Sequence, residues 1–210
     1  MKLPPTSGYE HNFKLEPWLT KGRRSNNCYA YAVHDFEKYR SNKSVPGGVS
    51  STKCKDLTRG VLSDNPKKVY KSRADQKCKK DYYKIMMVAD PGSDFHFYKQ
   101  HSTVNHVVQD GETINSIAKM WGVPWCRVKR VGPIRPGKKL RFKGNYFSHK
   151  RGWATGPLLL DACGKIIKDP RKACRNYQVL NYTKYCGSFC VKKNGINVGN
   201  TGSNLMQKIL

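Results

Sequence analysis

Two apolar runs in the middle of the chain predict a β-hairpin. Tyr83 to Ala89 and Phe95 to Gln100 are rich in aromatic and aliphatic residues, and the turn Asp90-Pro91-Gly92-Ser93 separates them. Tyr146 to Lys150 predicts a further strand, and residues 157–190 contain additional short strand and turn signals. These patterns favour a short antiparallel sheet.

One helix is predicted near the N-terminus, where Asn26 is a good N-cap for a partly apolar stretch that reaches Phe36. The preceding residues, 1–24, are expected to form an extended basic arm. Residues 41–81 are rich in Ser, Gly and Lys, and we expect a loop with little regular structure. Residues 193–210 are expected to be a flexible or docking tail. Strands combined with few helices predict an α+β fold.

Residues 106–142 contain both strand and helix patterns. A strand is predicted from His106 to Gln109, and a closing strand from Lys139 to Phe142. Between them, Pro124 begins a second short helix in which Val128 and Val131 should face inward. The first helix is indicated by residues that repeat with helical spacing, Ile114, Ile117, Ala118 and Trp121.

This βααβ order, with the pieces D-G-E-T, S-I-A, W-G-V and P-G-K-K-L, resembles the LysM module over residues 104–143. Pro133 and the missing Asn-rich stretch before the last turn depart from that family's pattern. The resemblance implies binding of an N-acetylglucosamine polymer such as chitin or peptidoglycan. The residues carried over to the binding groove are Asp110, Gly111, Glu112, Thr113, Ile134, Arg135 and Pro136. The alternative is that Glu112 and Thr113 only cap a helix and that Ile134 is a core residue.

The LysM-like module is expected to be an insertion, because its paired first and last strands bring its ends together. Removing residues 103–144 leaves a discontinuous host domain made of residues 25–102 and 145–192. In the shortened chain, the strand with His96 and the strand with His149 would form a hairpin.

Four motifs of the host domain carry a second resemblance. They are Asn27-Cys28-Tyr29-Ala30-Tyr31-Ala32, Asp94-Phe95-His96-Phe97-Tyr98, Ser148-His149-Lys150-Arg151-Gly152 and Tyr185-Cys186-Gly187-Ser188-Phe189-Cys190-Val191. In order and spacing they resemble papain-like cysteine peptidases of the NlpC type, in particular uncharacterised proteins of large DNA viruses and some bacteria. The host domain is therefore expected to have a papain-like fold with a short antiparallel sheet and an N-terminal helix.

The second resemblance implies a catalytic set of Cys28 as nucleophile, His96 as base and His149 as the group that orients His96. Asp94 and Gln100 are fallback candidates for the orienting role. The chemistry agrees, because a helix start beside an imidazole favours a thiolate. The alternative is that Cys28 is a buried, inert cysteine, as free cysteines often are.

The chain is strongly basic, with 40 Lys and Arg against 14 Asp and Glu, which gives a net charge of +26. This charge predicts a polyanionic partner, since about +2 to +8 suffices for solubility. We expect capsid or other particle proteins with acidic surfaces. Nucleic acid is less favoured, because zinc-finger spacing and an RRM-type aromatic signature are both missing. No apolar run is long enough to span a membrane.

The eight cysteines occur in a chain whose N-terminus lacks the apolar region of a secretion signal. Reduced thiols are therefore expected. The spacing of the cysteines indicates no zinc site, and we predict neither a metal nor a cofactor.

The favoured function is a virion-associated structural protein of the minor capsid type in a large DNA virus, assembled in the host cytoplasm. It would combine a papain-like scaffold with a glycan-binding insert. The alternative is an active cysteine amidase or peptidase that acts on peptidoglycan or a chitin-containing wall. A second alternative, a basic nucleic-acid-binding protein, rests on the charge alone.

Overall fold

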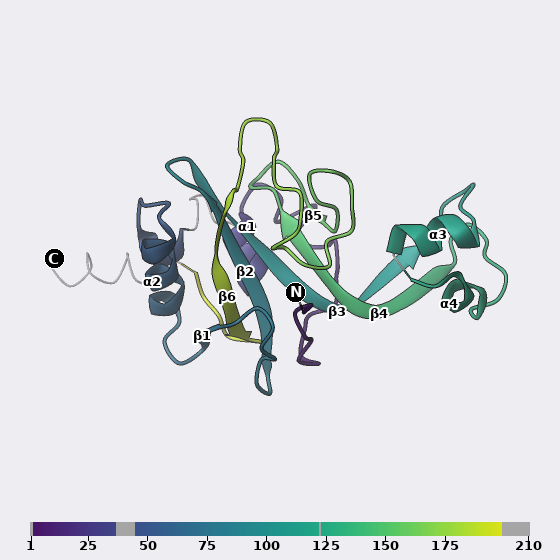
Figure 1. Cartoon of the computed structure of the whole chain (residues 1–210), viewed down its shortest axis with the longest axis horizontal. Coiled ribbons are helices and arrows are strands. Elements are labelled where there is room, and N and C mark those ends of the chain that lie inside the picture. Colours follow the sequence, from purple (N-terminus) through teal and green to yellow (C-terminus); the bar gives the residue numbers. More distant parts are fainter. Residues whose placement is uncertain (1, 37–44, 122, 199–210) are drawn as a thin grey trace, which may run out of the picture.

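The computed structural model describes residues 2–36, 45–121 and 123–198. Six antiparallel strands form one open sheet, and few helices accompany it (Figure 1). The expected α+β class with an antiparallel sheet is confirmed. In spatial order the strands are β1 (Val69–Ser72), β6 (Lys184–Lys192), β2 (Tyr82–Asp90), β3 (Asp94–Val107), β4 (Lys139–Lys150) and β5 (Pro157–Leu158).

Strand β2 lies in the middle of the sheet and packs on both of its faces. Because side chains alternate along a strand, Ile85 and Met87 join the core on one face, whereas Met86 and Val88 join the core on the other. The predicted hairpin is confirmed, with Asp90 opposite Asp94 at the turn. A strand covered on both faces reads as a continuous apolar run, which explains its clear sequence signal.

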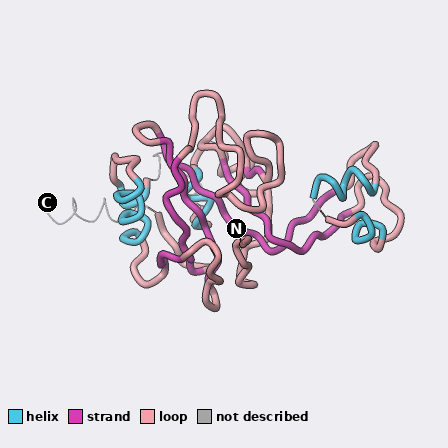
Figure 2. The backbone as a smooth tube through the Cα atoms, in the orientation of Figure 1, coloured by secondary structure: helices cyan, strands magenta, loops and turns pink. Residues whose placement is uncertain are grey.

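Two helices cover one face of the sheet. Helix α1 (Cys28–Val33) and helix α2 (Cys54–Asp64) share a core with the alternate residues of β2 and β3. A short 3-10 turn (Pro46–Gly48) packs on α2. The opposite face is covered by irregular chain between β5 and β6, which appears as the long loops above the sheet in Figure 2.

Strands β3 and β4 extend beyond the sheet as a two-stranded ribbon. A β-bulge between His101 and Thr103 marks the departure from the sheet, and bulges bend strands at such points. The ribbon carries helix α3 (Ile114–Trp121) and helix α4 (Trp125–Lys129) at its far end (Figure 1). These helices enclose a separate hydrophobic cluster with the ribbon. We call residues 103–144 the two-helix module.

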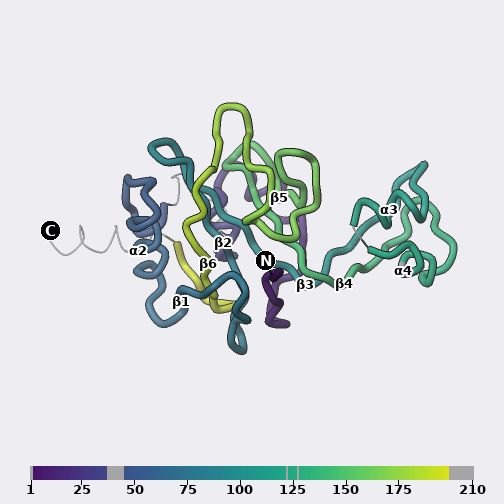
Figure 3. The backbone as a smooth tube through the Cα atoms, viewed as in Figure 1, coloured from purple at the N-terminus to yellow at the C-terminus, as the bar shows by residue number. Residues whose placement is uncertain are grey.

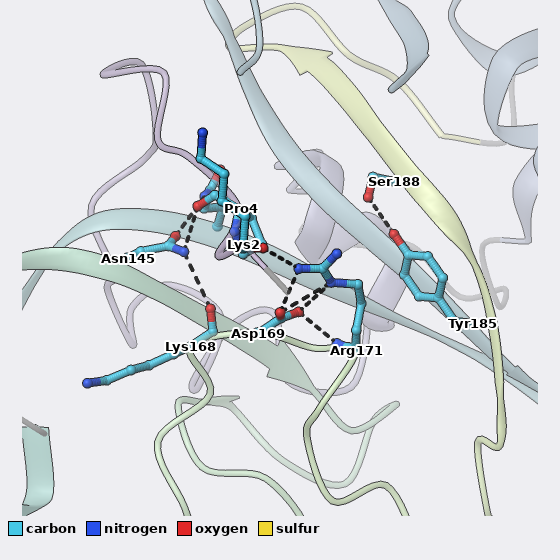
Figure 4. Close-up of polar contacts among 9 residues, drawn as sticks. Lys2, Pro4, Asn145, Lys168, Asp169, Arg171, Tyr185 and Ser188 are labelled. Atoms are coloured by element: carbon cyan, nitrogen blue, oxygen red, sulfur yellow. Dashed lines mark hydrogen bonds and ion pairs between the residues drawn. The ribbon is translucent and has the colours of Figure 1, made fainter. Parts of the chain in front are cut away.

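The residues before α1 lie against the body of the molecule (Figure 3). Described residues 2–24 contain neither helix nor strand. Asn145 donates to the carbonyl of Pro4 at 2.7 Å, and Arg171, paired with Asp169, donates to the carbonyl of Lys2 at 2.7 Å (Figure 4). Trp18 is buried beside Tyr31 of α1. The N-terminal segment is therefore part of the packed structure.

Six of the eight cysteines form disulfides, so the expectation of reduced thiols is wrong for them. The pairs are Cys54–Cys186, Cys78–Cys190 and Cys163–Cys174. The first two join partners 132 and 112 residues apart, a relation that spacing along the chain does not reveal. Cys28 and Cys126 take no part in these three disulfides.

Two local predictions are also wrong. The expected loop 41–81 contains α2 and β1 within its described part, residues 45–81. The start of α2 has no side-chain cap and is tied to β6 by Cys54, so it lacked a local start signal. In the two-helix module, Val128 is buried as expected, but Val131 is 44% exposed because α4 ends at Lys129.

Of the predicted tail, residues 199–210 lie outside the described residues, whereas Ile196 and Val198 are buried against the body. In the part of the chain that the structure describes, no helix has the length and apolar character needed to cross a membrane.

Candidate functional site

Cys28 is the first residue of α1. The Asn27 side chain caps this helix by accepting hydrogen bonds from the backbone N–H groups of Tyr29 and Ala30, at 3.0 and 3.2 Å. Cys28 is 5% exposed, and its Sγ lies 3.8 Å from the carbonyl oxygen of Phe95. The thiol therefore sits beside the start of β3, next to the residue that precedes His96.

Buried hydrogen bonds hold α1 on the sheet. The hydroxyls of Tyr31 and Ser148 lie 2.6 Å apart, which links the helix to β4. Tyr83 on β2 donates to the carbonyl of Ala32 at 2.9 Å. Tyr29 donates to Asp64 at the end of α2, at 2.8 Å. Because all six residues of these three bonds are buried, the bonds fix the position of Cys28 relative to β3 and β4.

His96 on β3 and His149 on β4 form a hydrogen-bonded pair. His96 Nε2 lies 2.7 Å from His149 Nδ1, and His149 Nε2 lies 2.9 Å from the carbonyl oxygen of Leu160. A carbonyl only accepts, so His149 carries its proton on Nε2 and accepts at Nδ1 when neutral. His96 must then donate from Nε2, which leaves its Nδ1 as an unprotonated base.

Burial keeps both imidazoles neutral near pH 7. Desolvation, followed by the charges of His149 and Arg151, holds the pKa of His96 well below its usual value. Desolvation also lowers the pKa of His149 to about 4, and the hydrogen bond to Leu160 opposes this change. His96 is therefore available as a proton acceptor, with its ring direction set by His149.

Two adjoining cavities open at these residues. The smaller, about 180 Å³, is lined by Cys28 and His96 together. The larger, about 340 Å³, also includes His96 and continues between Arg151 and Tyr177. The lining that both cavities share is formed by Asp94, His96, Gly152, Trp153 and Tyr182. A thiol and a neutral imidazole that face one cavity can attack a carbonyl carbon and transfer a proton.

The fallback candidates for the orienting role have other partners. Asp94 accepts a hydrogen bond from the Tyr182 hydroxyl at 2.9 Å, and burial followed by the charge of Asp94 raises the pKa of that phenol. Gln100 donates to the carbonyl of Pro4 and to the side chain of Asn145. The structure brings His149, rather than either of these residues, to His96.

The residues proposed for glycan contact are divided between two hollows. Glu112, Thr113 and Ile134 share one hollow, whereas Arg135 and Pro136 line the other. Asp110 and Gly111 are exposed on the turn before α3, outside both linings.

Two of these side chains have structural partners. Glu112 Oε2 lies 2.8 Å from His106 Nε2 and accepts from the backbone of Gln109 at 2.7 Å. Thr113 accepts from the backbone N–H of Ser116 at 3.1 Å and so caps α3. Their side chains therefore close the turn, as the alternative interpretation of these residues expects.

Trp125 was not among the predicted residues, although it stands in the same hollow as Glu112, Thr113 and Ile134. It is 55% exposed, and the ammonium of Lys129 lies 5.3 Å from the centre of its ring. An exposed indole can stack on a flat apolar face of a ligand. The signal in the sequence was an aromatic residue directly after the proline that opens α4.

Among the described residues, no group of His, Cys, Asp and Glu side chains has the arrangement of a metal site. Comparison of the chain with protein-family models, with curated proteins and with solved structures finds no match.

Proposed function

We propose that this protein is a papain-like cysteine amidase or peptidase of the NlpC type, whose two-helix module is a LysM-type glycan-binding insert. The observation that carries the proposal is that Cys28 and His96 line one cavity while His149 is hydrogen-bonded to Nε2 of His96. Nucleophile, base and orienting group are the three parts that acyl transfer by a cysteine requires.

The proposed reaction proceeds through a thioester. His96 takes the Cys28 proton at Nδ1, and the thiolate sulfur attacks the amide carbonyl carbon. The C–N bond breaks, and the amine leaves with the proton from His96. Water, deprotonated by His96, then attacks the thioester, which releases the acid and restores the thiol. Throughout both steps, His149 keeps the His96 ring in one orientation through the 2.7 Å hydrogen bond.

The two-helix module supports a wall polymer as the substrate. Its order of strand, two helices and strand agrees with the LysM pattern, and the hollow at Glu112, Thr113 and Ile134 adds the exposed ring of Trp125. A module that binds glycan raises the local concentration of wall amide bonds near Cys28. The proposed substrate class is therefore an amide within peptidoglycan or a chitin-containing wall.

Hydrolysis is tested with purified protein and isolated wall material. Release of new amino groups is measured for the wild type, Cys28→Ala and Cys126→Ala. The Cys126 variant is the matched control, because it removes the other cysteine outside the three disulfides, which is exposed. Release that disappears only in Cys28→Ala supports the proposal. Equal release, or none, from wild type and Cys28→Ala contradicts it.

Glycan binding is tested separately, by sedimentation with insoluble chitin and peptidoglycan. Trp125→Ala is expected to weaken binding by about 5- to 150-fold, since a stacked aromatic contact contributes about 1–3 kcal/mol. Met120→Ala is the control, because Met120 is an exposed apolar residue of the same module but does not line this hollow. Binding that is unchanged by Trp125→Ala rejects this surface as the glycan site.

A second candidate function is that of a structural component of a virion. The charge favours it: even if every one of the 14 acidic residues were paired, 26 Lys and Arg would remain for an acidic partner. Three disulfides also suit a particle that is exposed to oxidising surroundings. The test is fractionation of a producing cell lysate. Recovery with particles supports this role, and recovery only in the free fraction rejects it.

A further inference from the structure

Lys150 is the last residue of β4 and directly follows His149. Successive side chains of a strand point to opposite faces, so His149 meets His96 on one side while Lys150 points toward the approach to α1. The Lys150 side chain is 0% exposed. Lysine is among the residues least often fully buried, and the reaction proposed above gives this side chain no role.

Three backbone carbonyls surround the Lys150 ammonium. Nζ donates to Arg23 at 2.7 Å, to Asn26 at 2.7 Å and to Gly152 at 2.6 Å. A neutral amine has two hydrogens to donate, whereas an ammonium has three. Three acceptors at these distances therefore specify the charged form. Lys150 forms no ion pair with any carboxylate of the described residues.

The three carbonyls come from the segment that leads into α1 and from a residue that lines the Cys28 cavity. Asn26 lies directly before Asn27, the cap of α1, and so two residues before Cys28. Gly152 lines the cavity together with Cys28 and Trp153. Arg23 adds a second connection, since its guanidinium donates to the carbonyl of Ala154 at 2.8 Å. Lys150 thus ties the segment that leads into Cys28 to Gly152 of the cavity lining.

The Lys150 charge also acts on Cys28. Burial lowers the pKa of Lys150 to about 8, and a negative charge at Cys28 opposes that change. The effect is reciprocal, so the ammonium favours the Cys28 thiolate. Other charged or titratable groups face Cys28 or its neighbours from each surrounding segment: His96 and Asp94 on β3, Tyr182 before β6, Arg151 after β4 and Arg23 before α1.

We propose that Lys150 is a positioning residue for Cys28, because its ammonium fixes the start of α1 against the Gly152 wall and stabilises the Cys28 thiolate. Asp94 has the opposite charge and shares the cavity with Cys28, so it disfavours the thiolate. Lys150 offsets that effect with a cation that water does not screen. The inference rests on the proposed role of Cys28, but it concerns ionisation of the thiol rather than hydrolysis.

The test is the pH dependence of Cys28 alkylation by iodoacetamide between pH 5 and 9.5, with peptide mapping. The proteins are the wild type, Lys150→Met and Lys150→Arg. Methionine has a similar length without the charge, whereas arginine keeps the charge. The exposed Cys126 in the same samples is the internal reference. We expect the wild-type midpoint at Cys28 to lie at least one pH unit below that of Cys126.

In Lys150→Met, the Cys28 midpoint is expected to rise by about one pH unit, which is about a tenfold slower reaction at pH 6. In Lys150→Arg it should stay near the wild-type value. An unchanged midpoint in folded Lys150→Met overturns the inference. If circular dichroism shows Lys150→Met to be unfolded, Lys150→Arg decides: a Cys28 midpoint equal to that of Cys126 overturns the inference, and a wild-type midpoint supports it.

Failure of this inference is distinguishable from failure of the proposed function. If the pH midpoint of Cys28 alkylation depends on Lys150 but the protein releases no amine from wall material, the inference is retained and hydrolysis is rejected. If hydrolysis depends on Cys28 but the pH midpoint of Cys28 alkylation is the same in the wild type and Lys150→Met, the function is retained and the inference is rejected.

Discussion

At the scale of single residues, three side chains at the ends of two strands set the environment of Cys28. His96 presents an unprotonated Nδ1 because its hydrogen is on Nε2, which donates a hydrogen bond to His149 Nδ1. His149 can accept this bond because its own hydrogen is on Nε2, which donates to the carbonyl of Leu160. Lys150 follows in sequence and faces the other way, toward the start of α1. One strand end thus supplies both the orienting imidazole and a buried charge.

Removal of His149 tests this arrangement. In His149→Ala, the His96 Nε2–H loses its acceptor, and either ring nitrogen can then carry the proton. We expect alkylation of Cys28 at pH 6 to slow at least tenfold. The loss in His96→Ala should be larger, about 10²-fold or more, because general bases contribute that much. The measurement is the rate of iodoacetamide labelling by peptide mapping.

His106→Ala is the matched control, because His106 contacts Glu112 in the two-helix module, away from the Cys28 cavity. It should leave Cys28 labelling unchanged. A His149→Ala protein that reacts at the wild-type rate would show that His96 needs no orienting partner.

At the scale of elements, β6 depends on covalent links. It lies between β1 and β2, and it carries both Cys186 and Cys190. Cys186 joins it to the start of α2, and Cys190 joins it to the irregular chain before β2. These disulfides connect segments that are distant in sequence, so they restrict the unfolded chain as well as the folded one.

Replacement of Cys78 and Cys190 together by Ala should lower the free energy of unfolding by about 2–5 kcal/mol. Urea unfolding followed by tryptophan fluorescence measures the change. Cys126→Ser is the control and should alter stability by less than about 0.5 kcal/mol, because its thiol is exposed and unpaired. Equal stability of the double variant and the wild type would mean that this disulfide does not form in solution.

The two-helix module has a core of its own. Trp121 stacks on Phe142 with ring centres 5.4 Å apart and meets the edge of Tyr146 at 5.7 Å. All three belong to one cluster with α3 and α4. Trp121 and Phe142 lie within the module, Tyr146 pairs with His101 at its base, and Phe13, Leu159 and Ile166 pack against the edge of the cluster. None of these residues lines the Cys28 cavity, so the module is expected to loosen without disturbing Cys28.

Trp121→Ala should destabilise the module by about 3–5 kcal/mol. Hydrogen exchange followed by mass spectrometry is expected to show faster exchange in residues 104–143 only. Trp125→Ala removes an exposed ring from the same module and should leave exchange near the wild-type rate. Faster exchange of α1, or slower labelling of Cys28, in Trp121→Ala would show that the module and the site are coupled.

At the scale of the whole molecule, a chain of net charge +26 also buries basic groups. Five histidines have a lowered pKa, with burial as the main cause in each. The pKa values of His11 and His101 are about 3, that of His34 is about 2 and that of His149 is about 4, and the pKa of His96 is also well below its usual value. Lys99 is fully buried as well, and burial lowers its pKa.

These shifts predict loss of stability in mild acid. The unfolded histidines titrate near pH 6.5, so below that pH the unfolded chain binds more protons than the folded protein. The stabilisation is complete above about pH 6.5 and is lost as the pH falls toward the folded values of about 4 and below. The lowered pKa of Lys99 has the same sign of effect, because the unfolded chain binds a proton at Lys99 more readily than the folded protein does. Urea midpoints should fall steeply from pH 7 to pH 5, and less steeply in His11→Gln. Constant midpoints across this range would contradict the burial of these groups.

The features that depend on near neighbours could be predicted from the amino-acid sequence. Continuous apolar runs and turn residues predicted the β2–β3 hairpin, helical spacing predicted α3, and an asparagine cap predicted the start of α1 to within one residue. The motifs around Cys28, His96 and His149 selected residues that the structure brings to one cavity or into direct contact. Such signals are readable because hydrogen bonds and steric preferences within a few residues produce them.

The features that depend on contacts between distant segments became visible only in the fold. Helix α2 was not predicted, because it has no capping side chain. It is anchored instead by a disulfide to Cys186, which lies 132 residues away in the sequence. Lys150 reads as an ordinary surface lysine, yet carbonyls from before α1 and after β4 enclose it. Pairings and burial of this kind arise from packing between segments that are more than a hundred residues apart, and no local pattern encodes which segments will meet.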